Sequence, residues 1–355
     1  MEKIKKTFEH EQKKHVLILF VILISTMLLT FSGCAQSGSF EHWNKDAASL
    51  KELTDYVSTV TKKGGENFIP VEDRIAVFDL DGTLYGELAP TYFDWCTYAY
   101  RVLDDPDFKD KATSEMIKTA QTIRNIPTDG IPDWLEEAHI KNNAEAFAGF
   151  SIKEFQNYIR DYAQRDVPGF NNLKYADMFY KPMQDVISYL EANDFKVFIV
   201  SGTDTWVCRT LAEGKLDLPY DQIIGAIYNV IADHQGDKTG LEYTITKNDK
   251  IIRDGSYTVK NVKTYKINSI VERIGKQPVL SFGNSSGDFS MATFATTNNQ
   301  YLSKAFFNIA DDSEREFGNE TKAAAFKEKI VSNGWVPISM KNDWLTIYGE
   351  NVTKK

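Results

Sequence analysis

The sequence predicts an α/β fold, a parallel sheet with helices on both faces into which a helical block is inserted. Short apolar segments alternate with amphipathic helical segments along residues 48–84 and 181–355, an order typical of such a sheet. Residues 85–180 instead combine helical periodicity with many aromatic residues and contain no clear strand. We therefore expect residues 85–180 to be an insertion that follows the first strand.

Composition limits the kinds of protein that this chain can be. Its 355 residues suit one sizeable domain with an insertion, or two domains, and 42% of them are hydrophobic, enough for a large core. The net charge of -9, with no long basic run beyond the N-terminus, argues against nucleic acid as a partner. A small phosphorylated molecule needs only a local pocket and is compatible with this charge. Beyond residue 34 the cysteines are Cys96 and Cys208, expected to be buried free thiols.

The first thirty-four residues differ from the rest. Five lysines precede residue 15, residues 16–31 form an apolar run, and the run ends in Phe31-Ser32-Gly33-Cys34. This arrangement resembles the signal peptide and lipobox of bacterial lipoproteins, although Phe31 replaces the usual Leu. The resemblance implies a signal peptide over residues 1–33, lipidation of Cys34, and an exported protein anchored by its lipid to the membrane of the bacterial cell envelope. An uncleaved N-terminal anchor is the alternative, because the apolar run falls just below the ~17–25 residues that span a bilayer.

The remaining elements follow in chain order. Residues 34–47 are small and polar and are expected to be a tether. A helix follows over residues 48–61, and an apolar run from Arg74 to Leu80 predicts the first strand. Residues 240–262 alternate polar and apolar side chains around two turn signals and predict a β-hairpin excursion within the core. Further on, we expect helices over 183–193, 205–212 and 266–274, and strands over 196–200, 223–231 and 278–282.

Polar side chains follow three of the predicted strands. The strand ends read Asp79-Leu80-Asp81-Gly82-Thr83, Ser201-Gly202-Thr203 and Gly283-Asn284-Ser285-Ser286-Gly287-Asp288. In addition, Lys266 opens the helix that leads to the third of these strands. Because ligands of open α/β sheets bind outside the carboxyl ends of the strands, we expect these residues to share one site.

This set of residues, in this order, resembles the four motifs of the haloacid dehalogenase (HAD) superfamily. The resemblance covers about residues 70–350 and is closest to the phosphoserine-phosphatase-like branch, whose cap is inserted directly after the first motif. It implies a Rossmann-like core formed by residues 48–84 and 181–355, with a helical cap over residues 85–180 that closes over the site. It also implies a phosphatase that hydrolyses a small phosphomonoester through an aspartyl-phosphate, with Mg²⁺ as cofactor.

The two aspartates after the first strand have separate expected roles. Asp79 stands where a buried strand delivers a carboxylate to the sheet edge, so it is the candidate nucleophile. Asp81 lies two residues on, on the same side of an extended chain, and is the candidate acid/base. Superfamily members that dehalogenate or cleave phosphonates lack this second aspartate, so the resemblance favours phosphate ester chemistry.

Phosphate binding is expected to come from three segments. Gly82 lets the backbone turn close to the phosphate, and the following Thr83 belongs to the same turn. Ser201 and Gly202 are expected to hold a phosphoryl oxygen. Lys266 is expected to neutralise developing charge and to keep neighbouring carboxylates from repelling one another. Lys263 is the alternative to Lys266, which we favour because it has the spacing of a lysine that opens a helix.

The expected Mg²⁺ ligands are Asp79, the carbonyl of Asp81 and the loop that carries Asn284 and Asp288. Many relatives have aspartate where this chain has Asn284. An amide oxygen can still bind Mg²⁺, but the site loses one negative charge, and Asp288 becomes the main carboxylate of the loop. The sequence thus favours a working site with weaker metal affinity over a decayed enzyme, because the other motif residues are intact.

The first part of the insertion is rich in aromatic residues, and its role has two interpretations. The rings could form an aromatic cage for a quaternary ammonium group, as in the exported phosphorylcholine phosphatases of this superfamily. We favour the alternative that they form the core of the insertion. Three charged residues outside the motifs are equally well explained as structural ion pairs: Asp204, Arg209 and Arg315.

Two other functions stay open. A phosphotransferase or phosphomutase would use the same Asp79 and Asp81 through the same intermediate. A lipoprotein that binds a phosphorylated ligand without turnover is the second alternative, suggested by Asn284.

Overall fold

The computed structural model describes residues 39–126 and 130–355. The predicted signal peptide and Cys34 lie outside the described residues. From residue 39 onward the chain forms one compact unit. Among the described residues, no helix is both long enough and apolar enough to cross a membrane.

A seven-stranded sheet forms the centre of the protein, in the order β5-β4-β3-β1-β6-β7-β8. All neighbouring strands are parallel except β4 and β5, which are antiparallel. The predicted α/β fold with a Rossmann-like parallel core is therefore confirmed. The strands are β1 (Ile75–Phe78), β3 (Lys196–Asp204), β4 (Ile223–Ala232), β5 (Ile251–Val259), β6 (Leu280–Gly283), β7 (Lys304–Ile309) and β8 (Val336–Ser339).

Helices cover both faces of this sheet. Successive residues of a strand point to opposite faces. Val77 accordingly packs with Ile270 and Met291 on one face, whereas Phe78 belongs to the larger core cluster on the other. The helices of the core are α2 (Ala48–Thr61), α7 (Lys181–Ala192), α8 (Thr205–Ala212), α9 (Thr264–Arg273), α10 (Phe289–Thr296) and α11 (Glu320–Ser332). No element was predicted beyond residue 288. There the structure has β7 and β8, which extend the sheet beyond β6, and the helices α10 and α11.

The insertion leaves the core and returns to it at one place. Its two connecting segments run antiparallel: the Gly86 N–H donates to the Met178 carbonyl at 3.0 Å and the Tyr180 N–H to the Leu84 carbonyl at 2.9 Å. A two-stranded sheet, which the sequence did not predict, pairs β2 (Phe170–Asn171) of the returning segment with β9 (Thr353–Lys354). Between its two connecting segments, the insertion consists of four α-helices: α3 (Phe93–Leu103), α4 (Ser114–Arg124), α5 (Leu135–Ala146) and α6 (Ile152–Ala163).

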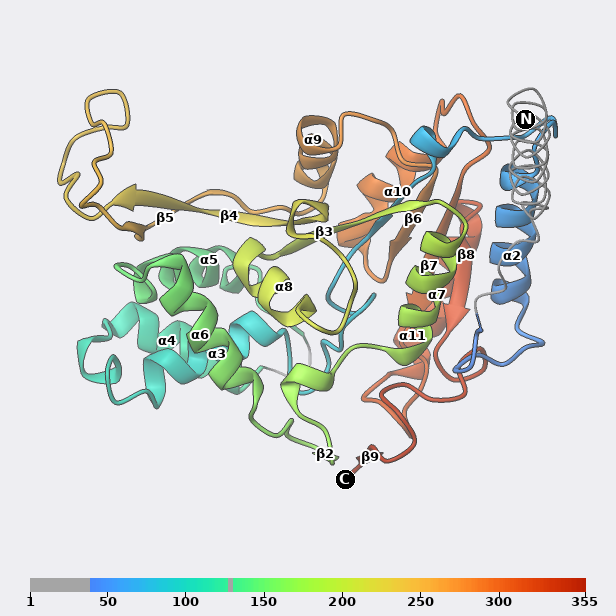
Figure 1. The fold of residues 1–355 in the computed structure, drawn as a ribbon. Coiled ribbons are helices and arrows are strands. Elements are labelled where there is room, and N and C mark those ends of the chain that lie inside the picture. The colour runs from blue at the N-terminus through green and yellow to red at the C-terminus, as the bar shows by residue number, and fades with distance from the viewer. Residues whose placement is uncertain (1–38, 127–129) are drawn as a thin grey trace, which may run out of the picture. The chain divides into compact units, whose positions relative to one another are not determined.

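The predicted hairpin within residues 240–262 is wrong. Residues 240–250 contain turns and no strand, and β5 pairs instead with β4, from Ala232 opposite Ile251 to Ile227 opposite Val259. Figure 1 shows the two strands projecting together from one end of the sheet, and β5 packs against α5 of the insertion. Alternation marks a strand but does not identify its partner, and the free edge of β4 offered unpaired backbone groups to β5.

The predicted tether is also corrected, because the part of it that the structure describes packs on the body. Trp43 is 1% exposed and its indole N–H donates to the Pro182 carbonyl at 2.7 Å. The main chain of Trp43 also bridges to Trp344, and the His42 ring lies 3.0 Å from Asp185. One large aromatic side chain buries enough apolar surface to hold an otherwise polar segment in place.

Candidate active site

The carboxyl edge of the sheet brings together predicted residues from three parts of the chain. Asp79 and Asp81 follow β1, Asp288 lies in the loop after β6, and Lys266 projects from the first turn of α9. The ammonium of Lys266 lies 2.5 Å from Asp79 Oδ1 and 2.7 Å from Asp288 Oδ1, and all three side chains are buried. Lys266 therefore links the end of β1 to the loop after β6.

The start of α9 determines which lysine enters the site. Lys263 has a φ of 51° and precedes the helix, and it is exposed. Its N–H donates to the Gly287 carbonyl at 3.2 Å, which fixes the helix start beside the loop after β6. Lys266, one turn later, is 2% exposed and points into the site. The geometry thus separates the two candidates in favour of Lys266.

Asp288 is held by its own loop. Its Oδ2 atom accepts the N–H groups of Asn284 and Ser285, each at 3.1 Å, which leaves Oδ1 for Lys266. The loop also requires glycine at position 283, since a Cβ there would lie 2.6 Å from the Cβ of Asp288. A carboxylate fixed by backbone donors is already oriented before any ligand binds.

Burial and charge act against each other in this cluster. Burial, together with the Asp288 carboxylate, raises the pKa of Asp79 to about 8, although Lys266 opposes the shift. Burial also disfavours the charge of Lys266, but the Asp288 and Asp79 carboxylates outweigh it and raise the pKa of the ammonium above its ordinary value. Lys266 is therefore a permanent positive charge beside the candidate nucleophile.

Asp81 is held by Thr203, which was expected at the site as part of a strand end but had no predicted role. The Thr203 hydroxyl donates to Asp81 Oδ2 at 2.7 Å, while Asp81 Oδ1 is buried without a hydrogen-bond partner. Burial raises the pKa of Asp81 above its ordinary value. The Ser201 hydroxyl accepts the Thr203 N–H at 3.1 Å and is fully buried, so Gly202 and Thr203 line the pocket in its place. The unpartnered oxygen of Asp81 is the one free to handle a proton.

Gly82 and Thr83, predicted to bind phosphate, pack against Asn284 and lie outside the pocket lining. Gly82 has a φ of +73°, and a Cβ there would come within 1.8 Å of the Asn284 side-chain nitrogen. Thr83 is fully buried, and its hydroxyl donates to Asn284 Oδ1 at 3.3 Å. Both residues therefore contact Asn284 and help to position its side chain.

The donor set fits a hard divalent cation such as Mg²⁺. The carboxylates of Asp79, Asp81, Glu87 and Asp288 all line the pocket, and Lys266 is the cation that contacts two of them. Carboxylate and amide oxygens are the ligands that Mg²⁺ prefers. The unpartnered Oδ1 of Asp81 further shows that this pocket contains polar atoms left without a protein partner.

The pocket has a volume of about 140 Å³ and lies between core and insertion. This is small beside the roughly 300–1,000 Å³ of sites for drug-sized ligands. The insertion contributes Glu87, Tyr92, Asp94, Trp95, Ile131 and Glu136 to the lining. The helical block therefore completes the wall of the pocket that Asp79, Lys266 and Asp288 of the core begin.

Asp94 of the insertion and Lys260 of the core also line the pocket, and neither was among the predicted site residues. Asp94 is 4% exposed, its Oδ1 has no partner, and burial raises its pKa to about 7. An acidic residue in an aromatic, helical stretch was the available signal. Lys260, from the connection between β5 and α9, lies 3.8 Å from Glu136 and pairs core with insertion across the pocket. No local pattern distinguished Lys260 from a surface lysine.

The aromatic residues of the insertion divide between its core and the pocket. Tyr85, Phe93 and Tyr98 are buried in the large core cluster. Tyr92 and Trp95 line the pocket, with ring centroids 5.2 Å apart. The core interpretation therefore holds for the buried rings, whereas an aromatic cage stays a prediction that involves Tyr92 and Trp95.

Asp204, Arg209 and Arg315, which the sequence could not assign to the site or to structural ion pairs, lie outside the pocket lining. Asp204 accepts from Arg253 of β5 at 2.7 Å, a pair in which each side chain is 1% exposed. Arg315 pairs with Asp312 at 2.6 Å and donates to several carbonyls of the C-terminal segment. Arg209 donates to the carbonyl of Tyr220 at 3.0 Å. All three have structural contacts.

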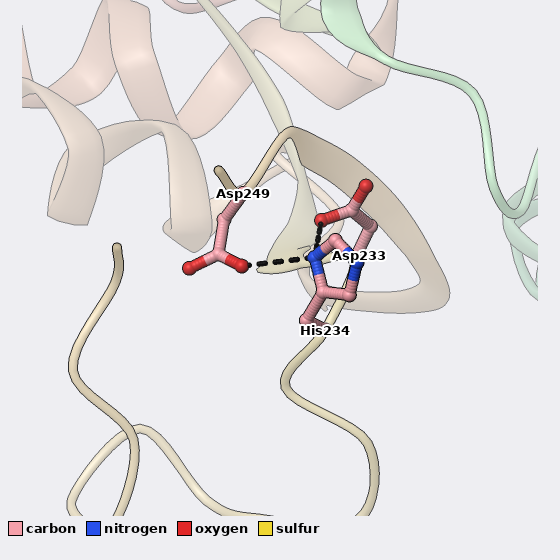
Figure 2. A group of neighbouring side chains, drawn as sticks. All are labelled: Asp233, His234 and Asp249. Atoms are coloured by element: carbon pink, nitrogen blue, oxygen red, sulfur yellow. Dashed lines mark hydrogen bonds and ion pairs between the residues drawn. The ribbon is translucent and has the colours of Figure 1, made fainter. Parts of the chain in front are cut away.

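A second group of potential ligands closes the loop between β4 and β5. Figure 2 shows His234 Nδ1 between Asp233, at 2.8 Å, and Asp249, at 3.0 Å. Asp249 also accepts the Tyr243 hydroxyl at 3.0 Å and the Thr246 N–H at 2.5 Å. Both oxygens of Asp249 therefore already have protein partners. The three side chains are explained as hydrogen bonds that stabilise the loop.

Fold and site together define an α/β protein with a lysine-bridged pair of carboxylates at the carboxyl edge of its sheet. Protein-family models and curated proteins give no match to the sequence. A solved structure with the same fold is that of a conserved protein of unknown function from Anaerococcus prevotii. Its TM-score is 0.50 and its identity 13%, over 87% of this chain and 98% of that one.

Two other solved structures resemble the chain at lower TM-scores. Cytosolic 5'-nucleotidase IIIB bound to cytidine has a TM-score of 0.46 and 10% identity, over 83% of this chain and 86% of its own. A phosphoserine phosphohydrolase-like protein from Francisella tularensis has a TM-score of 0.40 and 13% identity, over 75% and 94%. At such identities the likeness concerns the fold alone.

Proposed function

We propose that this chain is a phosphatase of the HAD superfamily that hydrolyses a small phosphomonoester through an aspartyl-phosphate. One observation carries the proposal: Lys266 holds Asp79 and Asp288 together at the sheet edge, and Asp81 lies in the same pocket with one oxygen free. A nucleophile, a proton carrier and a fixed positive charge are the groups that this reaction requires. The small volume of the pocket supports a small ester.

In the first step, a carboxylate oxygen of Asp79 attacks phosphorus. The bond between phosphorus and the ester oxygen breaks, and the leaving oxygen takes a proton from Asp81 Oδ1. In the second step, water gives a proton to Asp81 as it attacks the same phosphorus, releasing phosphate and restoring Asp79. Lys266 offsets the negative charge of the phosphoryl oxygens throughout.

Asp79, the Asp81 carbonyl, Asn284 and Asp288 are the groups that would hold Mg²⁺. When bound, the ion would reduce the repulsion between the phosphate dianion and the carboxylates of the site. The protein's own contribution is to keep those carboxylates fixed, through Lys266 and through the backbone N–H groups that Asp288 accepts.

The deciding experiment measures phosphate release by the purified full-length protein, in detergent, from a panel of phosphomonoesters with and without Mg²⁺. We expect metal-dependent release that Asp79→Asn abolishes and that Asp55→Asn, on the exposed face of α2, leaves unchanged. Transfer of phosphate only to an added acceptor alcohol would favour the phosphotransferase or phosphomutase. Tight binding of an ester without release would favour the binding lipoprotein.

We further propose that the protein is exported and anchored through a lipid on Cys34. The basic start, the apolar run and the small residues before Cys34 support this. Cells grown with labelled palmitate should label the wild-type protein and not Cys34→Ala. Equal labelling of both proteins would contradict lipidation at this residue.

A further inference from the structure

We propose that Glu87 is a further ligand of the divalent-cation site, and that position 284 carries asparagine because Glu87 supplies the carboxylate. The inference rests on the cation site of the proposed function. It places one ligand on the segment that leads into the inserted helices, and the others on the core. Asn284 is then not expected to weaken Mg²⁺ binding, because the carboxylate of Glu87 supplies the negative charge that asparagine lacks.

The first argument is a direct contact between the two side chains. The Asn284 side-chain nitrogen donates to Glu87 Oε1 at 2.8 Å. The Asn284 side-chain oxygen accepts the Thr83 hydroxyl at 3.3 Å. Hydrogen bonds at both ends of the amide therefore fix its orientation. An amide can donate to Glu87, whereas a carboxylate at position 284 would place two negative charges at this separation.

The second argument is that both chain segments are held in place. A Cβ at position 82 would lie 2.5 Å from Cγ of Asn284 and 2.7 Å from Cδ of Glu87, so both side chains rest against the backbone of Gly82. Glu87 follows Gly86, whose N–H donates to the Met178 carbonyl at 3.0 Å. A Cβ at position 86 would lie 2.2 Å from the Tyr348 hydroxyl. The carboxylate of Glu87 is therefore presented by closely packed backbone.

The third argument is the charge of the pocket. Glu87 is within electrostatic reach of Asp79, Asp81 and Asp288, and all four line the same cavity. Lys266 contacts two of them, and the nearest ion pair of the other lining lysine, Lys260, is with Glu136. Four carboxyl groups beside one bridging lysine cannot all ionise without repelling one another, and a divalent cation is the ligand that favours their ionised forms.

The test is a double-mutant cycle on Mg²⁺ binding, measured by titration calorimetry on the full-length protein in detergent. Glu87→Gln keeps the acceptor for Asn284 and removes the charge, and we expect it to weaken Mg²⁺ binding at least about tenfold. Asn284→Asp alone should weaken binding or leave it unchanged. The double variant, with the carboxylate moved to position 284, should recover most of the wild-type affinity. Glu66→Gln, an exposed glutamate outside the pocket lining, is the matched control and should bind as the wild type does.

Binding by Glu87→Gln at wild-type affinity would overturn the inference, as would tighter binding by Asn284→Asp alone or an absence of Mg²⁺ binding by the wild type. Thermal melting without Mg²⁺ checks that each nearly isosteric variant is folded. The electron paramagnetic resonance spectrum of bound Mn²⁺ gives a second readout that needs no turnover. If the wild type releases no phosphate and the binding cycle still holds, the phosphatase proposal fails and the cation site stands.

Discussion

The hydroxyl of Thr203 donates to Asp81 Oδ2 at 2.7 Å and leaves Oδ1 of the same carboxylate without a partner. The two residues lie 122 positions apart and meet because β1 and β3 are neighbours in the sheet. A hydrogen bond to a carboxylate favours its ionised form, whereas burial favours the protonated form. Burial dominates and raises the pKa of Asp81, and Thr203 limits the shift.

Thr203→Val should therefore move the acidic limb of the pH–rate profile toward higher pH. The substitution removes the donor, so the pKa of Asp81 rises further, and the ionised form needed to activate water appears only at higher pH. We expect a shift of about 1 pH unit in kcat for a phosphomonoester. Thr203→Ser keeps the hydroxyl and should restore the wild-type profile. A profile that is unchanged in Thr203→Val would contradict the proposed role of Asp81.

Mg²⁺ binding should strengthen as the pH rises. The pKa of Asp79 is raised to about 8, so below this pH the carboxyl holds a proton that a bound cation must displace. Between pH 6 and 8 the association constant should rise up to about tenfold per pH unit and level off above pH 8. Calorimetry in two buffers of different ionisation enthalpy measures the released protons directly. An affinity that is flat from pH 6 to 9 would argue against Asp79 as a ligand.

Substitution of Arg253 should destabilise the protein strongly. Arg253→Met leaves Asp204 buried without its ion-pair partner, which costs about 3–5 kcal/mol in the free energy of unfolding. Urea denaturation of the metal-free protein measures the loss. Adding Asp204→Asn removes the unpaired charge, and the asparagine oxygen can still accept the N–H of Trp206. The double variant should therefore recover at least half of the lost free energy of unfolding. Equal stability of the single and double variants would show that the pair is not the cause.

Trp43→Ala should also lower stability, by about 3–5 kcal/mol, because a buried indole and its hydrogen bond to Pro182 are lost. The same measurement applies, with Leu345→Ala as the control, since Leu345 is 61% exposed. A true tether would give no difference between the two variants. The outcome therefore distinguishes an anchored N-terminal segment from a flexible one.

The two pocket aromatics should affect substrate choice. If Tyr92 and Trp95 contact a cationic leaving group, Trp95→Leu should raise KM for phosphorylcholine at least about tenfold while changing KM for a neutral alkyl phosphate little. Tyr98→Leu, in the core of the insertion, is the comparison and should affect stability and not selectivity. Equal changes in KM for both esters after Trp95→Leu would show that the ring only shapes the pocket.

Sequence alone determined the fold class and which residues gather at the candidate site. Asp79 and Asp81 are readable because an apolar run stops at them, and buried parallel strands end at the ligand-binding edge. Helix α2 and helix α8 have the predicted bounds, because the spacing of apolar residues records which face of a helix is buried. Lys266 could be favoured over Lys263 from its place at the helix start.

Only the tertiary structure decided which residues meet across long sequence separations. The partner of β5, the burial of Trp43, and the contacts of Thr203 with Asp81 and of Glu87 with Asn284 all join residues that carry no local mark of one another. The periodicity of apolar residues predicts that a side chain is buried, but it does not predict which residues that side chain packs against. The packing of the insertion on the core supplied those partners, and with them the charge balance of the pocket.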